Sequence, residues 1–234
     1  MRITSWNANC KFREKFHLLK AFDVAVVQEC EEPARCSDDG YKAWAINHYW
    51  IGNLKHKGLG VFLNESMSAE LMEIPETSQK LFLPLQLSDG TQILAVWAMN
   101  AENRQDGYVA QIHDYLESNS RYFNWERLII IGDFNSNAKW DGKRELRNHG
   151  NLVKKFDGFG LQSLYHYQES EHHGAEKSST FFMYRHKDKP YHIDYIFLPV
   201  KKLVGSRIEL GQAQEWLQYS DHVPLFADLE WPSH

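Results

Sequence analysis

The stretch from Leu128 to Asn137, which reads LIIIGDFNSN, constrains the fold of this chain more than any other. Four apolar residues, three of them β-branched, run directly into Gly-Asp-Phe-Asn. So short a continuous apolar run is typical of a strand buried on both faces. Gly132 then releases the backbone, and Asp133 and Asn135 point to the same side because residues two apart in a strand share a face. The stretch therefore predicts a strand that delivers a carboxylate and an amide at its carboxyl end, where α/β sheets place their sites. The alternative is a solvated turn, in which Asp and Asn are ordinary residues.

Further segments also place a polar side chain at the end of a strand-like run or within one. They are RITSW followed by Asn7, VAVVQ followed by Glu29, HIDYIFL with Asp194, and YSDHVPLF with Asp221 and His222. Buried carboxylates are costly when unpaired, so we expect these groups to pair with one another or to bind a cation. Several carboxylate and amide oxygens favour a hard divalent ion, Mg²⁺ first and Mn²⁺ next.

The composition fits one domain over residues 1–234, because 43% of the residues are hydrophobic and no linker or long repeat divides the chain. The net charge of −5 argues against a general nucleic-acid coat, which would be basic. No stretch approaches the ~18 apolar residues of a membrane span, and the N-terminus has no signal-peptide pattern. Cys10, Cys30 and Cys36 are odd in number and lack metal-type spacing, which predicts reduced thiols in a cytoplasmic protein.

Many strand-like runs interleaved with few helical patterns predict two packed sheets with helices outside. Besides the runs already named, strand-like segments are Gly58–Leu63, Leu81–Leu87, Gln92–Met99, Ser179–Tyr184 and Val223–Leu229, with one or two short strands in Tyr41–Asn53. The second and third of these flank Ser-Asp-Gly-Thr, which is a hairpin signal. Apolar residues at helical spacing predict helices over Lys11–Phe22, over Tyr108–Leu116 and around Leu152–Phe156.

A basic segment follows the central motif. Residues 139–155 carry several positive charges, among them Lys139, Lys143 and Arg144, with Trp140 between them. One interpretation is a solvated face. The other is a loop that grips a nucleic-acid backbone beside the site, with Trp140 stacking on a base.

A second polar segment, further along the chain, contains His172 and His173. These histidines lie among the acidic residues Glu169, Glu171 and Glu176. A flexible surface loop is favoured here over a metal site. Phe181 and Phe182 come shortly afterwards, and we expect them in the core rather than as a platform for a base.

Taken in order, the motifs SWNAN, VVQE, GDFNSN, HIDYIF and SDHVPL resemble those of the endonuclease/exonuclease/phosphatase superfamily. This group includes exonuclease III-like apurinic endonucleases and pancreatic deoxyribonuclease. The motifs extend from residue 5 to residue 225, nearly the whole chain. The resemblance implies an α/β, DNase I-like fold: a four-layered sandwich of two packed, mostly antiparallel sheets flanked by helices. It also implies a Mg²⁺-dependent phosphodiester hydrolase, with Mn²⁺ as a second ion and no further cofactor.

The resemblance implies a role for each matching position. Three positions correspond to the metal side of the site: Glu29, Asn7 and Asp221. Asp133 corresponds to the aspartate that orients or deprotonates the attacking water, and Asn135 to the amide that holds this water and a phosphate oxygen. His222 corresponds to the histidine that contacts the phosphate, and Asp194 to the aspartate that orients this histidine. A metal ion and a protonated histidine together neutralise a phosphodiester so that water can attack it.

One segment departs from the family pattern. Apurinic endonucleases carry a Tyr-x-Pro-Asn type segment where this chain has Trp97-Ala98-Met99-Asn100. Asn100 can still serve the catalytic site by holding a phosphate oxygen, whereas Trp97 offers an indole N–H and no phenolic hydroxyl. The departure argues against abasic-site cleavage and leaves the metal chemistry intact.

The leading prediction is a nuclease whose substrate is nucleic acid, DNA in the first place, cut as an endonuclease of modest sequence preference. We expect a monomer without a membrane or protein partner. Two alternatives stay open: a phosphodiesterase or phosphatase for RNA, nucleotides or small phosphorylated or lipid-linked substrates, and a non-catalytic module that kept the fold. In the leading case the predicted substrate contacts are Trp97, Trp140, Lys139, Lys143 and Arg144.

Overall fold

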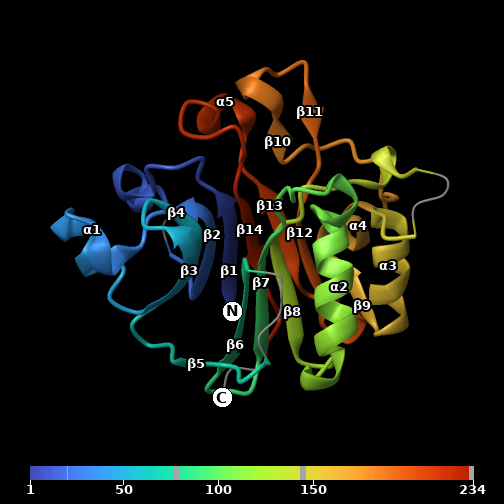
Figure 1. The fold of residues 1–234 in the computed structure, drawn as a ribbon, viewed down its shortest axis with the longest axis horizontal. Helices are drawn as coiled ribbons and strands as arrows, with labels where there is room; N and C mark the ends of the chain where they lie inside the picture. Colours follow the sequence, from blue (N-terminus) through green and yellow to red (C-terminus); the bar gives the residue numbers. More distant parts are fainter. Residues whose placement is uncertain (20, 76–79, 143–145, 232–234) are drawn as a thin grey trace.

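Two six-stranded sheets packed face to face form the centre of the molecule. The computed structural model describes residues 1–19, 21–75, 80–142 and 146–231 (Figure 1). The first sheet has the strand order β13-β14-β1-β2-β4-β3, and the second has the order β5-β6-β7-β8-β12-β9. Only β1–β2 and β7–β8 are parallel among the paired strands described, so both sheets are mixed and mostly antiparallel. The fold class expected from the sequence is confirmed.

The elements have the following bounds. The first sheet contains β1 (Arg2–Asn7), β2 (Val24–Cys30), β3 (His48–Leu54), β4 (Lys57–Leu63), β13 (Arg207–Leu210) and β14 (Leu225–Asp228). The second contains β5 (Ala69–Leu71), β6 (Phe82–Leu87), β7 (Gln92–Trp97), β8 (Leu128–Asp133), β9 (Leu161–Ser163) and β12 (Asp194–Pro199). A two-stranded ribbon joins β10 (Phe181–Phe182) to β11 (Pro190–Tyr191). The α-helices are α1 (Asp39–Trp44), α2 (Val109–Asn119), α3 (His149–Gly158), α4 (Leu164–Glu169) and α5 (Ala213–Trp216).

The central strand β8 shows how the layers are built. Ile129 and Ile131 belong to the apolar layer between the two sheets, while Leu128 and Ile130 belong to the layer under α2 and α3. All four side chains are completely buried. Because both faces of the strand are covered, the sequence needs no polar alternation, which confirms the buried strand predicted from LIIIG.

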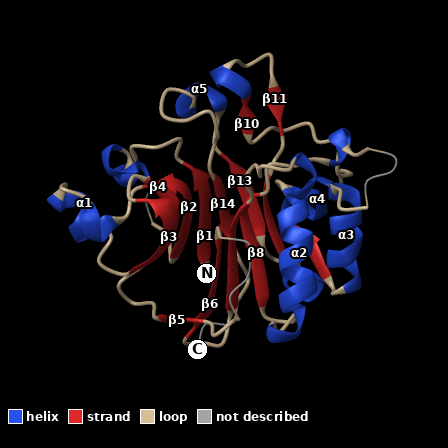
Figure 2. Ribbon diagram, in the orientation of Figure 1, coloured by secondary structure: helices blue, strands red, loops and turns tan. Residues whose placement is uncertain are grey.

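Helices cover the two outer faces. α2 and α3 lie on the outside of the second sheet and α1 lies beyond the first, as the colouring of Figure 2 makes plain. Under α1, Tyr41 packs against Phe12 and Phe62, and Phe12 packs against Trp6, in a third apolar layer. No helix among the described residues is long and apolar enough to cross a membrane. All three cysteines are free thiols.

The helix predicted over Lys11–Phe22 is wrong. The segment instead forms two short 3-10 helices, η1 (Phe12–Glu14) and η2 (Phe16–Leu18). Asn9, Cys10 and Lys11 all have positive φ, which turns the chain sharply before a regular helix can begin. Lys15 also points inward and donates to the carbonyls of Cys10 and Tyr219 at 2.7 and 2.8 Å. The apolar spacing therefore reflects packing against the sheet and not helical repetition.

Most other segments agree with the sequence patterns, with local differences. The 81–87 and 92–99 runs form the predicted hairpin β6–β7, and helices lie where Tyr108–Leu116 and Leu152–Phe156 predict them. The aromatic stretch that begins at Tyr41 supplies the helix α1 before its strand β3. The strand predicted over Ser179–Tyr184 shrinks to the two residues of β10, because Tyr184 adopts a left-handed conformation.

Candidate active site

Asp133 lies at the centre of a hydrogen-bonded group at the carboxyl end of β8. Its side chain is fully buried. The amides of Asn7 and Asn135 each donate to its Oδ2 at 3.0 Å, and the backbone N–H of Asn135 donates to Oδ1 at 2.8 Å. Asn7 comes from the end of β1, so this contact joins the two sheets at one edge. The structure thus brings Asn7, 126 positions before Asp133, and Asn135, 2 positions after it, to the same carboxylate.

Gly132 is required for this strand end. Its φ is +142°, and a Cβ at this position would lie 1.9 Å from the carbonyl oxygen of Val96 on the neighbouring β7. No side chain fits there, since real Cβ contacts are never so short. The following Asn135 also has a positive φ of 47°, a conformation that asparagine tolerates better than most residues. The backbone is therefore fixed where the carboxylate and the amide emerge.

Asp194 and His222 form a buried pair beside Asp133. His222 Nδ1 lies 2.9 Å from Asp194 Oδ2. Asp194 on β12 is directly opposite Asp133 on β8 in the antiparallel register, so the two carboxylates are cross-strand neighbours. Thr180 Oγ1 accepts the backbone N–H groups of Ile193 and Asp194 at 3.0 and 3.1 Å, which fixes the start of β12.

Burial and charge set the protonation of this group. Burial and the nearby carboxylate of Asp194 raise the pKa of Asp133 to about 7, although His222 and the hydrogen bonds from Asn7 and Asn135 act in the opposite direction. Burial alone would lower the pKa of His222, but the neighbouring carboxylates, Asp194 foremost, raise it to about 9. His222 therefore carries a positive charge at pH 7, beside an acid that titrates near neutrality.

Glu29 and Asp221 lie at the same edge. β1 and β2 are parallel, so Asn7 and Glu29 leave the sheet together. Glu29 has a φ of 59° at the bulge where β2 pairs with β4, and bulges re-aim side chains in this way. Its Oε2 lies 3.0 Å from the ammonium of Lys57. Asp221 Oδ1 accepts from the amide of Asn9 at 2.7 Å.

The donors present fit a divalent cation. Glu29 and Asp221 are only partly buried carboxylates on the rim, and hard divalent ions prefer such oxygen ligands. Asp133, Asp194 and His222 offer ligand atoms within 4.8 Å of one another. The buried Oδ1 of Asp194 has no hydrogen-bond partner among the described residues. A nearby positive charge lowers the cost of burying so many carboxylate oxygens together. His222 supplies one such charge.

The predicted substrate contacts occupy different environments. Trp140 is 47% exposed, and Lys139 beside it is exposed. Trp97 is 2% exposed, so it has little surface to offer a substrate, and the ammonium of Lys57 lies 5.4 Å from its ring. Asn100 is exposed in the loop after β7, where its Oδ1 accepts from the next backbone N–H. The remaining two predicted contacts, Lys143 and Arg144, lie outside the described residues.

A cavity of about 1240 Å³ opens beside Asn135. Aromatic side chains line it from three segments: Trp140, Phe181 and Tyr108. Phe181 is half-buried rather than in the core, and its ring centroid lies 4.7 Å from that of His222. The cavity therefore runs from the candidate active site to the segment that carries Trp140.

Sequence patterns missed four residues that hold the site. Lys57, Asn9 and Thr180 contact Glu29, Asp221 and the start of β12, and Ser220 Oγ donates to the backbone carbonyl of Asn7 at 2.7 Å. Asn9 carries a signal in the motif SWNAN, because it follows Asn7 by two residues. The others are single polar residues whose partners are distant in sequence, so no local pattern marks them.

Comparisons with known proteins agree with this fold. No family model and no curated protein sequence matches the chain. Solved structures match it over nearly its whole length. A 3′-5′ exonuclease (NExo) from Neisseria meningitidis covers 99% of this chain and 100% of its own, with a TM-score of 0.69 and 18% identity. An AP endonuclease from Archaeoglobus fulgidus has the same coverage, with a TM-score of 0.71 and 14% identity.

Two further structures extend the comparison. A 3′ phosphatase NExo from Neisseria, bound to a product DNA hairpin, matches with a TM-score of 0.67 and 16% identity over 99% of this chain and 100% of its own. The endonuclease domain of TRAS1, a telomere-specific non-LTR retrotransposon, matches with a TM-score of 0.63 and 16% identity over 97% of both chains. Because the identities are this low, the matches establish the fold alone. The chain has the DNase I-like fold that its motifs imply.

Proposed function

We propose that this chain is a divalent-metal-dependent phosphodiester hydrolase that acts on nucleic acid, DNA in the first place. The observation that carries the proposal is that two groups lie side by side. One is Asp133, held by two amides, and the other is a protonated His222, hydrogen-bonded to Asp194. These groups combine a candidate base with a fixed positive charge, the two requirements for attack of water on an anionic phosphate.

Each residue has a place in the proposed reaction. Glu29, Asp221 and Asn7 would hold the ion, Mg²⁺ or Mn²⁺, which when bound neutralises phosphate charge and makes water a better nucleophile. Asp133 takes the proton of the attacking water, and a pKa near 7 suits a base at neutral pH. Asn135 donates to this carboxylate and lies where it can hold the attacking water beside it.

His222 and Asp194 act on the phosphate side. The Asp194 carboxylate accepts from Nδ1 of His222, so the remaining N–H at Nε2 is the one available to a phosphate oxygen. Because both side chains are at least 95% buried, the ring cannot be solvated away from this orientation. The pair therefore supplies a donor whose charge and direction are set before substrate arrives.

Two observations support nucleic acid as the substrate, and a third limits what the basic segment can contribute. One structural neighbour is bound to a DNA hairpin, and the others are an exonuclease, an AP endonuclease and an endonuclease domain. The cavity beside Asn135 is lined by aromatic side chains, on which bases can stack. Arg147 in the basic segment is already paired with Asp106 and Asp114, so only part of that segment's charge is free for a phosphate backbone. A monomeric protein in the cytoplasm, without a protein partner, remains a prediction.

The test is cleavage of a substrate panel with and without Mg²⁺. The panel contains supercoiled plasmid, linear DNA with a 3′ phosphate, DNA with an abasic site, and RNA. We expect cleavage of DNA that EDTA abolishes and added Mg²⁺ restores. Asp133→Asn should reduce the rate at least ~100-fold, because it removes the base but keeps the size of the side chain.

The matched control is Asp157→Asn, which changes an exposed carboxylate on α3. It should leave the rate unchanged. The proposal fails if no nucleic acid in the panel is cut, or if Asp133→Asn cuts as fast as the wild type. A parallel assay measures phosphate release from nucleotides and inositol phosphates. Activity in that assay without cleavage of any nucleic acid would favour the small-substrate alternative instead.

A further inference from the structure

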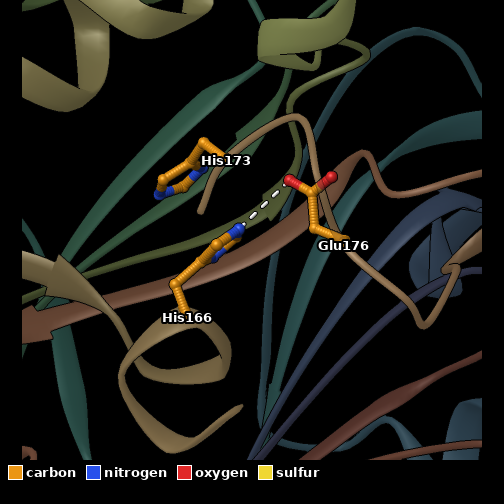
Figure 3. Close-up of side chains that lie close together, drawn as sticks. All are labelled: His166, His173 and Glu176. Carbon is orange, nitrogen blue, oxygen red and sulfur yellow. Dashed lines mark hydrogen bonds and ion pairs between the residues drawn. The ribbon is translucent and has the colours of Figure 1, made fainter. Parts of the chain in front are cut away.

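A second polar cluster lies away from the candidate active site, next to α4. It contains His166 on α4 together with His173 and Glu176 from the loop that follows, and Figure 3 shows the three side chains converging. The side chains of His166 and Glu176 are 7% and 5% exposed. The sequence favoured a flexible surface loop for this segment; the structure shows a loop in which His172 is exposed, while His173 is only partly exposed and stacks on His166.

The ligand-type atoms of the three residues lie close together. His166 Nε2 is hydrogen-bonded to Glu176 Oε1 at 3.1 Å. The rings of His166 and His173 are stacked with centroids 3.5 Å apart, so one ring must turn before both can bind the same ion. One nitrogen or oxygen from each of the three residues lies within 4.8 Å of the others. Two ligands of a tetrahedral Zn²⁺, each ~2.0–2.2 Å from the metal, stand about 3.4 Å apart. The spacing of His166 and Glu176 is close to this value.

Surrounding groups hold the cluster in place. Ser163 Oγ lies 2.8 Å from His166 Nδ1, and His149 Nε2 lies 3.1 Å from His173 Nδ1. The amide of Asn137 donates to Glu176 Oε2 at 3.1 Å. Metal sites characteristically have such a shell of groups around the ligands, because it fixes ring orientation and carboxylate charge.

His192, whose ring lies next to that of His166, adds a buried nitrogen without a hydrogen-bond partner in the described part of the chain. Its Nδ1–H donates to the carbonyl of Ser178 at 2.9 Å, so Nε2 must carry the lone pair. That nitrogen is buried and has no hydrogen-bond partner among the described residues. The ring centroid of His192 lies 5.6 Å from that of His166. A buried acceptor without a donor is costly, unless a cation or a cation-bound water faces it.

We propose that His166, His173 and Glu176 bind one Zn²⁺ ion, with His192 beside it. Two imidazoles and one carboxylate are a borderline donor set, which favours Zn²⁺ over the hard Mg²⁺ or Ca²⁺. The three residues lie on α4 and the loop after it and are not among those of the candidate active site, so we assign the ion a structural role. It ties residues 170–177 to α4.

The loop held by the metal leads directly to the candidate active site. Thr180, four residues after Glu176, accepts the N–H of Asp194, and the next residue but one, Phe182, donates to the carbonyl of Asp221 at 2.8 Å. Asn137 connects from the other side, since its amide also donates to the carbonyl of His192 at 2.9 Å. Loss of the ion should therefore loosen the backbone that positions Asp194 and Asp221, whatever reaction the protein catalyses.

Calorimetric titration of the chelator-treated full chain with Zn²⁺, in excess Mg²⁺, tests the proposal. We expect one tight Zn²⁺ site that is weakened at least ~100-fold in His173→Asn and in Glu176→Gln. His172→Asn, the neighbouring exposed histidine, is the matched control and should bind as the wild type does. Zn²⁺ should also raise the melting temperature of the wild type and of His172→Asn, and of neither ligand variant.

Further controls separate the loss of a ligand from loss of folding and from binding elsewhere. Circular dichroism of the metal-free variants checks that each is folded, and Co²⁺ should give the visible absorption of a tetrahedral site only when the ligands are intact. The proposal is overturned if His173→Asn and Glu176→Gln both retain wild-type Zn²⁺ affinity. It is also overturned if Zn²⁺ binding is lost in Asp194→Asn but kept in the two ligand variants, because the ion then occupies the candidate active site.

Discussion

Replacement of Asp194 by Asn gives the sharpest test of the buried pair. The side chain keeps its shape and can still accept from Nδ1 of His222, 2.9 Å away, but its charge is gone. Asp194 is the foremost cause of the raised pKa of His222, about 9 against an ordinary 6.5. Without it burial is the largest remaining influence, opposed by the carboxylates of Asp133 and Asp221, and we expect the pKa of His222 to fall from about 9 toward its ordinary 6.5. The protonated fraction at pH 7.5, about 97% in the wild type, should therefore drop toward the roughly 10% that a pKa of 6.5 gives.

The same change has a calculable effect on stability. The folded pKa lies above the ordinary value, so the contribution of the pair is complete below pH 6.5 and is lost as the pH rises through 9. A difference of about 2.5 between the two pKa values corresponds to about 3 kcal/mol, at 1.36 kcal/mol for each pH unit. The free energy of unfolding of Asp194→Asn should therefore be lower than that of the wild type by about this amount at pH 6, and by much less at pH 9.5.

Nuclear magnetic resonance of the ring nitrogens of His222 measures its titration directly, and the rate of DNA cleavage follows the same charge. We expect at least a tenfold loss of kcat/KM at pH 7.5 with partial recovery at lower pH. Asp157→Asn, an exposed carboxylate change, should alter neither quantity. If His222 still titrates near 9 in Asp194→Asn, the electrostatic account of the pair is refuted.

Three further outcomes are expected. The rate of cleavage by the wild type should be highest between pH 7 and pH 9, because Asp133 is protonated below this range and His222 loses its proton above it. A rate that fails to fall at low pH, or fails to fall at high pH, contradicts the assignment. Gly132→Ala should lower the free energy of unfolding by more than ~3 kcal/mol in chemical denaturation, since its Cβ overlaps the Val96 carbonyl, whereas Gly158→Ala, with no atom near the new methyl, should not. Trp140→Ala should raise KM for DNA about fivefold or more with little change in kcat, the effect of one lost base-stacking contact; an unchanged KM would exclude that contact.

The strands could be predicted from the sequence because their signals are local. An apolar run such as Leu128–Ile131 must be buried on both faces, and a glycine before Asp133 marks the point where the chain leaves the sheet. The candidate active site could be predicted from the order of the motifs. Asn7, Asp133 and the Asp194–His222 pair lie together as the superfamily resemblance implies. The reactions assigned to these residues remain predictions.

The failures have a common physical origin. The Lys11–Phe22 segment shows helical spacing, yet three consecutive left-handed residues and an inward-pointing Lys15 stop a helix from forming. His166 stands alone in its helix, and only the folded chain brings His173 and Glu176 to it. Side chains that act through partners distant in sequence leave no periodic signal, so a single sequence cannot reveal them.

The position of Asp133 on β8 has a consequence for how the molecule fluctuates. β8 is bonded to β7 on one edge and to β12 on the other, and its side chains are covered from both directions. Its amides should be among the last to exchange with solvent, so local opening elsewhere leaves the carboxylate at its end undisturbed. Loops at the rim can then rearrange while the Asp133 carboxylate stays fixed.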